Sequence, residues 1–351
     1  MGASLPLLLK VWARDGFVAP RHAGLALGML GSALLRAPVG LVEQWMWRRG
    51  EGPALEPPVF IIGHWRSGTT HLHNLMGKAP CFGHISPLAT GLPNELLTLA
   101  TWLRPWLEKA LPEDRHVDQV QVTPDSPQED EIPLANLQPH SVFHGLYFPR
   151  HFEDRMRQGI FFEGLPNAAV EEWKLRMQHF LQKVARHQGK GLLLVKNPVY
   201  TARIGLLREL WPQARFVHIH RDPTTVFVST VHYYRKLLAM YALQDPSSVD
   251  VESFVLQTYS RLMEAYDAQI EAVPAHLRAE VGFEALEAAP LQEVARIWSE
   301  LELPDWAEAE PPIRDYLDSI RGYAKNRFEV SDEVARTVEG HWGKWVQRYA
   351  T

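Results

Sequence analysis

The clearest indication of the fold is the sequence Val59-Phe-Ile-Ile-Gly63-His-Trp-Arg-Ser-Gly-Thr-Thr70. Its start, Val59 to Ile62, is a short apolar run typical of a buried β-strand, and the residues from His71 to Met76 suit a helix. A strand that turns through a glycine-bounded loop into a helix presents backbone N–H groups and the positive end of the helix dipole to one anionic group. We therefore expect an anion-binding loop between them.

The loop differs from a nucleoside-triphosphate P-loop in the position of its cation. Gly63 and Gly68 satisfy the G-x-x-x-x-G spacing, but Thr69 stands where that motif requires a phosphate-binding Lys. A cation is found inside the loop instead, as Arg66, whose forked guanidinium can hold two oxygens of a terminal phospho- or sulfo-group. Thr70 follows Thr69 and adds a second hydroxyl donor at the helix start. This arrangement argues against an ordinary kinase or ATPase.

Further short apolar runs alternate with helical stretches, which predicts βαβ units and an α/β fold with a central parallel sheet. The expected strands, after the first, are Leu192 to Val195, Phe216 to Ile219 and Val281 to Phe283. The expected helices are Glu171 to His187, Ile204 to Leu210, Val251 to Ile270 and Leu291 to Leu301. The segment from Cys81 to Phe162 shows no clear periodicity and suits either a structured insertion over a site or an irregular surface region.

Composition limits the class of protein. The chain has 351 residues, and 46% of them are hydrophobic, which is typical of a folded globular protein. Its formal charge of −5 disfavours a nucleic-acid binder. Its single cysteine, Cys81, suits a small buried side chain and a reducing cytoplasm. A Gly/Pro-rich linker, GEGPALEPP at Gly50 to Pro58, divides a helical extension at 1–50 from a main domain at 58–351.

The extension at 1–50 lacks the basic leader of a signal peptide. Its longest early run without charge or His, Ala23 to Leu35, is shorter than the roughly 20 residues needed to span a bilayer. Arginines interleave its apolar residues, as in a segment that lies at a membrane interface. Helices that pack on the enzyme body are the simpler interpretation, and peripheral membrane contact is the alternative.

The quoted loop resembles the 5′-phosphosulfate loop of sulfotransferases that use 3′-phosphoadenosine-5′-phosphosulfate. It is most similar to the broad bacterial branch of that family, whose loop carries Arg in place of Lys. The resemblance implies a P-loop-related α/β fold, the phosphosulfate compound as co-substrate, and no metal. It also implies that the backbone around Ser67 to Thr70, including Gly68 and Thr69, holds the 5′-phosphate, with Arg66 on the transferring group.

A second segment, Phe216-Val-His-Ile-His-Arg221-Asp-Pro-Thr-Thr-Val-Phe-Val-Ser229, has the family's arrangement of a strand, an Arg, a turn and a Ser. Arg221 is expected at the carboxyl end of a strand and Ser229 two turns into the next helix, so both can face one phosphate. The resemblance assigns both residues to the 3′-phosphate of the donor. It also assigns Lys196, at the end of the strand before Asn197, to the transferring group.

The acceptor proton requires a base, and Pro127-Gln-Glu-Asp-Glu131 supplies carboxylates. A similar segment occurs in bacterial relatives, so Glu129 is the first choice, with Glu131 and Asp130 behind it. In the simpler interpretation, Ser126 caps a helix that begins at Pro127 and the acids only complement its dipole.

Histidines are the competing bases, and His64 lies inside the loop itself. The pairs His71/His73 and His218/His220 lack a clear third and fourth ligand, so no metal site is expected.

The tail carries a partial match. Arg321-Gly-Tyr323-Ala-Lys325-Asn-Arg resembles a Tyr-x-x-Asn segment of related bacterial proteins, which would place Arg321, Tyr323 and Lys325 over the donor nucleotide. A solvated basic turn explains the same residues. The final aromatic residues are spaced for one helical face and are expected in the core; they are Trp342, Trp345 and Tyr349.

The sequence thus predicts a cytoplasmic sulfotransferase that acts on a hydroxyl or amine of a small-molecule acceptor. Its apolar N-terminal segment and its aromatic residues favour a hydrophobic or lipid-like acceptor. The enzyme is expected in the cytoplasm, with the inner face of a membrane as the alternative location. A P-loop kinase or other phosphotransferase is the first alternative, which Thr69 disfavours. A non-enzymatic, membrane-peripheral nucleotide-binding protein is the second.

Overall fold

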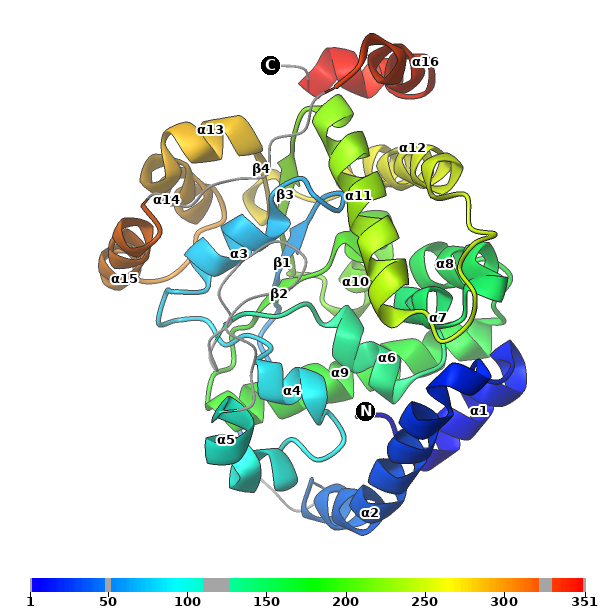
Figure 1. The fold of residues 1–351 in the computed structure, drawn as a ribbon. Helices are drawn as coiled ribbons and strands as arrows, with labels where there is room; N and C mark the ends of the chain where they lie inside the picture. The colour runs from blue at the N-terminus through cyan, green and yellow to red at the C-terminus, as the bar shows by residue number, and fades with distance from the viewer. Residues whose placement is uncertain (1, 48–51, 110–125, 322–329, 350–351) are drawn as a thin grey trace. The chain divides into compact units, whose positions relative to one another are not determined.

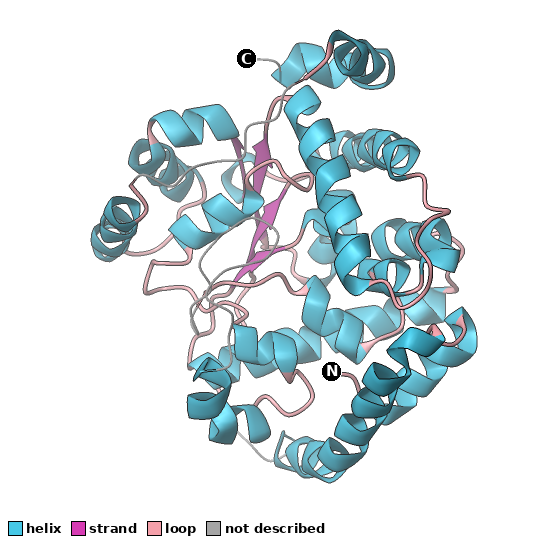
Figure 2. Cartoon of the chain, viewed as in Figure 1, coloured by secondary structure: helices cyan, strands magenta, loops and turns pink. Residues whose placement is uncertain are grey.

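A computed structural model describes residues 2–47, 52–109, 126–321 and 330–349, with side chains of 107–109 left aside. The chain divides into two compact units, each made of segments distant in sequence. One unit comprises Met1–Leu55, His84–Gly191 and Lys236–Val249, and the other Glu56–Gly83, Leu192–Arg235 and Asp250–Thr351. The second unit holds the sheet, and the first is helical (Figures 1 and 2).

The sheet has four strands in the order β2-β1-β3-β4, and every pairing is parallel. The strands are β1 (Val59–Ile62), β2 (Leu194–Lys196), β3 (Arg215–His220) and β4 (Arg278–Gly282). Every residue of β1 is fully buried, as expected for a parallel strand covered on both faces. The predicted α/β class and parallel sheet are therefore confirmed.

The order of the strands creates a switch point beside β1. The connection from β1 leads to β2 on one side, whereas β3 pairs with the other side of β1 and is followed outward by β4. In open parallel sheets a ligand crevice lies beyond the carboxyl ends of two strands whose connections run in opposite directions. The loops that follow β1 and β3 meet this condition, and both contain predicted site residues.

Alternate residues of β1 serve the two faces of the sheet. Val59 and Ile61 belong to an apolar core that also includes Leu72 of α3 (Thr69–Met76) and Trp298 of α14 (Pro290–Glu300). Helices α13 (Phe283–Ala288) and α15 (Trp306–Ser319) add to this face (Figure 1). On the other face Phe60 packs against the rings of three aromatic residues, Tyr200, Trp211 and Phe216.

The remaining helices of the sheet-bearing unit are η3 (Pro198–Ala202), α10 (Ile204–Leu210), α11 (Pro223–Tyr241), α12 (Val251–Ile270), η4 (Ala275–Leu277) and α16 (Asp332–Tyr349). The last turns of α11 extend into the helical unit. The tail aromatic residues Trp342, Trp345 and Tyr349 are buried, and Trp342 stacks on Tyr259 with ring centroids 3.8 Å apart. Their predicted place in the core is confirmed.

The helical unit begins with α1 (Leu5–Asp15), η1 (Pro20–His22) and α2 (Ala23–Trp47). It continues with α4 (Pro87–Gly91), α5 (Leu99–Lys109), α6 (Glu131–Leu137), α7 (Val142–Tyr147), η2 (Pro149–His151), α8 (Phe152–Phe161) and α9 (Asn167–Gln188). The segment without clear periodicity is thus helical wherever the structure describes it as regular. Its helices are mostly too short to impose a repeat on the sequence.

Several predicted boundaries need correction. The third and fourth strands begin earlier than predicted, and Phe283 begins α13 instead of ending a strand. The helix predicted from Pro127 begins at Glu131, so Ser126 is not its cap. Cys81 is partly buried against the sheet core and not fully enclosed.

Candidate functional site

Two glycines shape the loop after β1. Gly63 has φ +140°, and a Cβ there would lie 2.3 Å from the carbonyl oxygen of Ile219. Gly68 has φ +100° at the N-cap of α3, and its Cβ would lie 2.3 Å from Cδ2 of Phe283. Both positions therefore require glycine, since left-handed backbone and close approach exclude a side chain. Helix α3 therefore starts directly after the loop, and the backbone N–H groups of a helix start are suited to an anion.

Arg66 projects from this loop toward helix α11. Its backbone lies in the left-handed region, at φ 70°, which is unusual for a residue other than glycine. Its Nε donates a 3.0 Å hydrogen bond to Oγ of the buried Ser229 on α11, and its guanidinium lies 5.6 Å from the ring centre of Tyr233. The structure thus brings two predicted site residues, Arg66 and Ser229, into direct contact.

Lys196 is the last residue of β2, next to β1 in the sheet, and it is 1% exposed. Its Nζ lies 3.4 Å from Oγ1 of Thr70, in the first turn of α3. An ammonium group is placed at such a depth only where its charge is compensated. The contact joins Lys196 to the helix that follows the loop after β1.

Arg221 follows the carboxyl end of β3 and completes the group. Its guanidinium lies 4.3 Å from the ring centre of Phe283, and its Nε is 3.8 Å from a carboxylate oxygen of Glu284. Burial lowers the pKa of Arg221 foremost, Glu284 raises it, and the positive charge of Arg66 lowers it further. Among the described residues, no group accepts a hydrogen bond from this buried Nε.

Cationic side chains therefore follow three neighbouring parallel strands at one edge of the sheet: Arg66 after β1, Lys196 ending β2 and Arg221 after β3.

The remaining predicted loop positions are Ser67, Thr69 and Thr70. The hydroxyl of Ser67 is turned inward, because it donates a 2.8 Å hydrogen bond to the carbonyl of His64. Its backbone N–H also reaches that carbonyl, at 3.2 Å.

The carboxylate candidates belong to the other unit. Glu131 is buried at the start of α6, and its Oε1 accepts a 3.1 Å hydrogen bond from the backbone N–H of Val142. Asp130 is buried at the N-cap of the same helix. Glu129 is partly exposed in the preceding loop. Its predicted role as the base stays a prediction.

The histidines show different environments. His64 is buried, its Nδ1 donates to the carbonyl of Trp65 at 2.9 Å, and burial lowers its pKa to about 4. His218 contacts Glu280, with 2.9 Å between Nδ1 and Oε1, while His220 stacks on Tyr349. Among the residues described here, no cluster of three or more His, Cys, Asp or Glu is arranged to hold a metal ion.

Of the three tail residues predicted to lie over the nucleotide, the structure describes Arg321. Arg321 is exposed and forms a 2.8 Å ion pair with Asp318, one turn before it. Tyr323 and Lys325 lie outside the described residues. Two ring contacts of the site are not predicted from the sequence: Tyr233 beside Arg66 and Phe283 beside Arg221. Only the position of Tyr233, four residues after Ser229 on one helical face, offered a signal.

The fold and the site together define a P-loop-like α/β protein with Arg, Lys and hydroxyl side chains at the carboxyl ends of its central strands. Residues 57–308 match the model of the Sulfotransferase family. The chain belongs to this family and is an enzyme, a sulfotransferase. The predicted family is thereby confirmed.

Individual relatives agree with this assignment. The chain is 31% identical to omega-hydroxy-beta-dihydromenaquinone-9 sulfotransferase Stf3 of Mycobacterium bovis, over 99% of this chain and 90% of that protein. Its fold is similar to that of sulfotransferase STF9 from Mycobacterium avium, with a TM-score of 0.65, 16% identity, and coverage of 91% and 81% of the two chains. Sulfotransferase STF1 from Mycobacterium tuberculosis H37Rv gives a TM-score of 0.63 at 18% identity, over 96% and 90%.

Proposed function

We propose that this sulfotransferase takes its sulfuryl group from 3′-phosphoadenosine-5′-phosphosulfate and transfers it to a hydroxyl group of a hydrophobic, lipid-like acceptor. The observation that carries the proposal is the edge of the sheet where Arg66, Lys196 and Arg221 follow adjacent strands. Sulfuryl transfer needs cations where negative charge grows on the leaving oxygen and on the sulfuryl oxygens.

The residues present fit a donor that carries phosphate at two positions. Backbone N–H groups at the start of α3 and the glycine cradle at Gly63 and Gly68 suit one anionic group. The buried Nε of Arg221, which has no hydrogen-bond acceptor among the described residues, suits a second anionic group close by. A donor with both a 5′-phosphosulfate and a 3′-phosphate would satisfy both.

Each side chain then has a distinct task. Arg221 and Ser229 would bind the 3′-phosphate, and the backbone from Ser67 to Thr70 the 5′-phosphate. Arg66 and Lys196 would stabilise charge on the transferring group. The phosphosulfate supplies a good leaving group, and the protein supplies orientation and charge. Glu129 would accept the proton of the acceptor hydroxyl.

The segment that begins at Arg321 belongs to the same proposed site. Arg321, Tyr323 and Lys325 would close over the nucleotide.

A sulfotransferase of this kind needs no metal, because arginine and lysine side chains supply the positive charge.

The acceptor class rests on a relative and on composition. The mycobacterial relative is named for omega-hydroxy-beta-dihydromenaquinone-9, whose name describes a hydroxylated menaquinone. A similar acceptor for this chain agrees with its aromatic content, 10% of residues. A lipid-like acceptor resides in a membrane, so we place the reaction in the cytoplasm at the inner face of a membrane.

Nucleotide-dependent stabilisation tests the donor. Thermal unfolding is measured with 3′-phosphoadenosine-5′-phosphate, and with ATP in the presence and absence of Mg²⁺. The proposal expects stabilisation by the 3′-phosphorylated nucleotide alone, and its loss in Arg221→Ala. The matched control is Arg215→Ala, at the opposite end of β3, where Arg215 donates a 2.7 Å hydrogen bond to the carbonyl of Leu301. This control should lower stability but keep the nucleotide response. Preference for ATP with Mg²⁺ would instead indicate a phosphotransferase.

A further inference from the structure

Helix α2 reverses the usual distribution of side chains on a protein surface. Its sequence holds charges only at Arg36 and Glu43, and both are buried. Its exposed side is apolar, and the large hydrophobic residues there are Leu25, Leu27, Leu34, Leu35, Leu41, Val42, Trp45 and Met46. A surface helix in water normally turns its charges outward and its apolar stripe inward. The side of α2 that faces away from the protein is therefore apolar.

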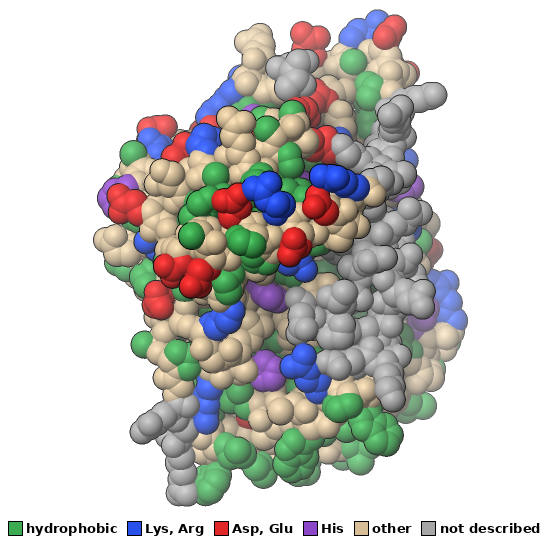
Figure 3. Space-filling model, turned by 90° about the vertical axis from the view of Figure 1, so that its left-hand side faces the viewer, with side chains coloured by type: hydrophobic (Ala, Val, Ile, Leu, Met, Phe, Trp, Pro, Cys, Tyr) green, Lys and Arg blue, Asp and Glu red, His purple; other side chains and the backbone are tan. Residues whose placement is uncertain are grey.

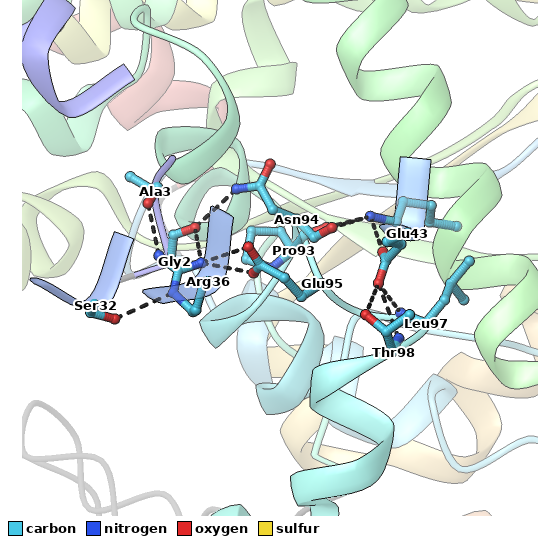
Figure 4. A network of polar contacts seen from close by, with 11 residues as sticks. Gly2, Ala3, Ser32, Arg36, Glu43, Pro93, Asn94, Glu95, Leu97 and Thr98 are labelled. Carbon is cyan, nitrogen blue, oxygen red and sulfur yellow. Dashed lines mark hydrogen bonds and ion pairs between the residues drawn. The ribbon is translucent and has the colours of Figure 1, made fainter. Parts of the chain in front are cut away.

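The charge of Arg36 is fully engaged inside the helical unit (Figure 4). Its guanidinium donates to both carboxylate oxygens of Glu95, at 2.9 and 2.7 Å, and to the carbonyl oxygens of Gly2 and Ala3. Several acceptors around one guanidinium, a carboxylate among them, make a buried charge tolerable. Arg36 thus fixes one side of α2 to protein.

Glu43, nearer the C-terminal end of α2, is also a buried charge bound to the protein. It accepts hydrogen bonds from the backbone N–H groups of Leu97 and Thr98, both at 3.0 Å, and from the Thr98 hydroxyl at 2.7 Å (Figure 4). It also pairs with Lys183 of α9, which in turn donates to the carbonyl of Pro93 at 2.8 Å. The polar side of α2 is therefore attached at both Arg36 and Glu43.

Helix α5 extends the apolar surface. It begins directly after the segment that binds Glu43, and it exposes Trp102 and Trp106, at 79% and 75%. Hydrophobic side chains gather along the lower edge of the molecule in Figure 3, where Figure 1 places these helices. Trp45 is also exposed, near the end of α2. Indole rings of this kind prefer the headgroup level of a bilayer.

Within the described segment 2–47, the charged side chains that are not buried have one sign. Lys10 and Arg21 are exposed and Arg14 is partly so. The acidic residues of the described segment 2–47 are Asp15 and Glu43, and both are buried in ion pairs. This distribution is complementary to an anionic lipid surface.

We propose that the outward face of α2, with Trp102 and Trp106 of α5, docks on the anionic leaflet of a membrane, and that α2 lies in the membrane plane. The span Pro20–Trp47 is long and apolar enough to cross a bilayer by length and composition. Crossing would carry Arg36 and Glu43 into hydrocarbon together with the loop and helix that bind them. An in-plane position keeps these bonds and buries the apolar face.

A second copy of the chain fits this surface less well. Most homodimers are two-fold symmetric, so each face meets its own copy, and the basic residues at its edge would be brought together. An anionic leaflet instead attracts Lys10, Arg14 and Arg21. The inference is independent of the donor and acceptor, because it concerns residues outside the proposed chemistry.

Vesicle binding by the full chain tests the proposal. The probe is sedimentation with vesicles of phosphatidylglycerol and phosphatidylcholine, compared with phosphatidylcholine alone. The test variant is Leu27→Glu combined with Leu35→Glu, and the matched control is Leu175→Glu on α9. Leu27 and Leu175 are 69% and 67% exposed, so the substitutions are equally tolerable in water. Thermal unfolding of each variant verifies the fold.

We expect wild type and the Leu175→Glu control to bind anionic vesicles, and the double variant to lose on the order of tenfold or more in affinity. Alkaline carbonate should release the bound protein, since no helix crosses the bilayer. Failure of wild type to bind, equal binding by the double variant, or resistance to carbonate would each overturn the proposal. A wild-type dimer that the double variant converts to monomer, without vesicle binding, would assign the surface to a second copy. None of these readouts depends on turnover.

Discussion

Arg66 donates a 3.0 Å hydrogen bond to Ser229, a residue 163 positions away in the chain. The bond connects the loop after β1 to the helix after β3, across the point where the strand order reverses. It holds a guanidinium in place before any ligand binds. Preorganised charge of this kind needs no rearrangement when negative charge develops during transfer.

Replacement of Ser229 should weaken binding of the product nucleotide. Ser229→Ala removes both the acceptor for Arg66 and a proposed hydroxyl donor to the 3′-phosphate. A lost hydrogen bond to a charged group costs about 1.5–3 kcal/mol, so calorimetry with 3′-phosphoadenosine-5′-phosphate should show a Kd raised at least about tenfold. The control is Ser260→Ala on α12, whose hydroxyl donates to the carbonyl of Leu256. An unchanged Kd in Ser229→Ala would contradict the assignment.

Gly68 should tolerate no side chain, whereas Gly189 should tolerate one at modest cost. Both have positive φ, +100° and +68°, but only at Gly68 would a Cβ meet another group, the Phe283 ring at 2.3 Å. Gly189→Ala therefore carries backbone strain alone, about 1 kcal/mol of unfolding free energy. Gly68→Ala should lose the nucleotide response in thermal unfolding while Gly189→Ala keeps it. Equal nucleotide responses would show that the loop does not depend on Gly68.

Replacement of Lys196 should lower turnover more than it weakens nucleotide binding. Lys196→Met keeps the length of the side chain but removes the charge next to Thr70. If that charge stabilises the transferring group, turnover should fall by roughly 10²–10³-fold, the usual loss for one stabilising donor at the reacting centre. Turnover is measured as release of 3′-phosphoadenosine-5′-phosphate with a long-chain alcohol as acceptor. Near-normal turnover in a correctly folded variant would exclude Lys196 from the chemistry.

The sequence predicted those parts of the site that depend on neighbouring residues. The loop from Gly63 to Thr70 follows from a strand, glycine spacing and a helix start, all local in the chain. Arg221 and Lys196 were predicted because strand ends in a parallel sheet converge at one edge. The bond between Arg66 and Ser229 was not predicted, since periodicity carries no information about side-chain pairing over such a separation.

The orientation of helix α2 could not be predicted from the sequence. Its sequence is apolar with few charges, and it leaves packing on the enzyme body and peripheral membrane contact as alternatives. In the structure Arg36 and Glu43 are buried, because their partners include residues 95–98 and Lys183. Composition alone cannot indicate which side of such a helix faces protein. The short helices between Cys81 and Phe162 escaped prediction for a related reason, since few of them complete enough turns to show a period.

Acidification should destabilise the protein in part through His64. Burial lowers the pKa of His64 from 6.5 to about 4, so the unfolded chain binds a proton at a higher pH than the folded one. The contribution of neutral His64 to stability is therefore complete above pH 6.5 and declines as pH falls toward 4. His64→Asn keeps a donor for the Trp65 carbonyl and removes the titration. Its melting temperature should fall less between pH 7 and 5 than that of wild type.

The control for His64 is a histidine on the surface. His341 is exposed on α16 and contacts the carbonyl of Thr337. His341→Asn should show the same loss of melting temperature on acidification as wild type. If both variants follow the wild-type curve, His64 does not contribute to the acid sensitivity.

Substitutions of Glu129 and Glu131 should affect different properties, turnover for Glu129 and melting temperature for Glu131. Glu131 is buried and accepts the backbone N–H of Val142, so Glu131→Gln should lower the melting temperature and leave the turnover of folded protein nearly unchanged. Glu129 is partly exposed, and Glu129→Gln should leave the melting temperature unchanged. If Glu129 accepts the acceptor proton, turnover should fall by roughly 10²–10⁴-fold. A reversed result, with turnover lost in Glu131→Gln at unchanged stability, would assign the base to Glu131.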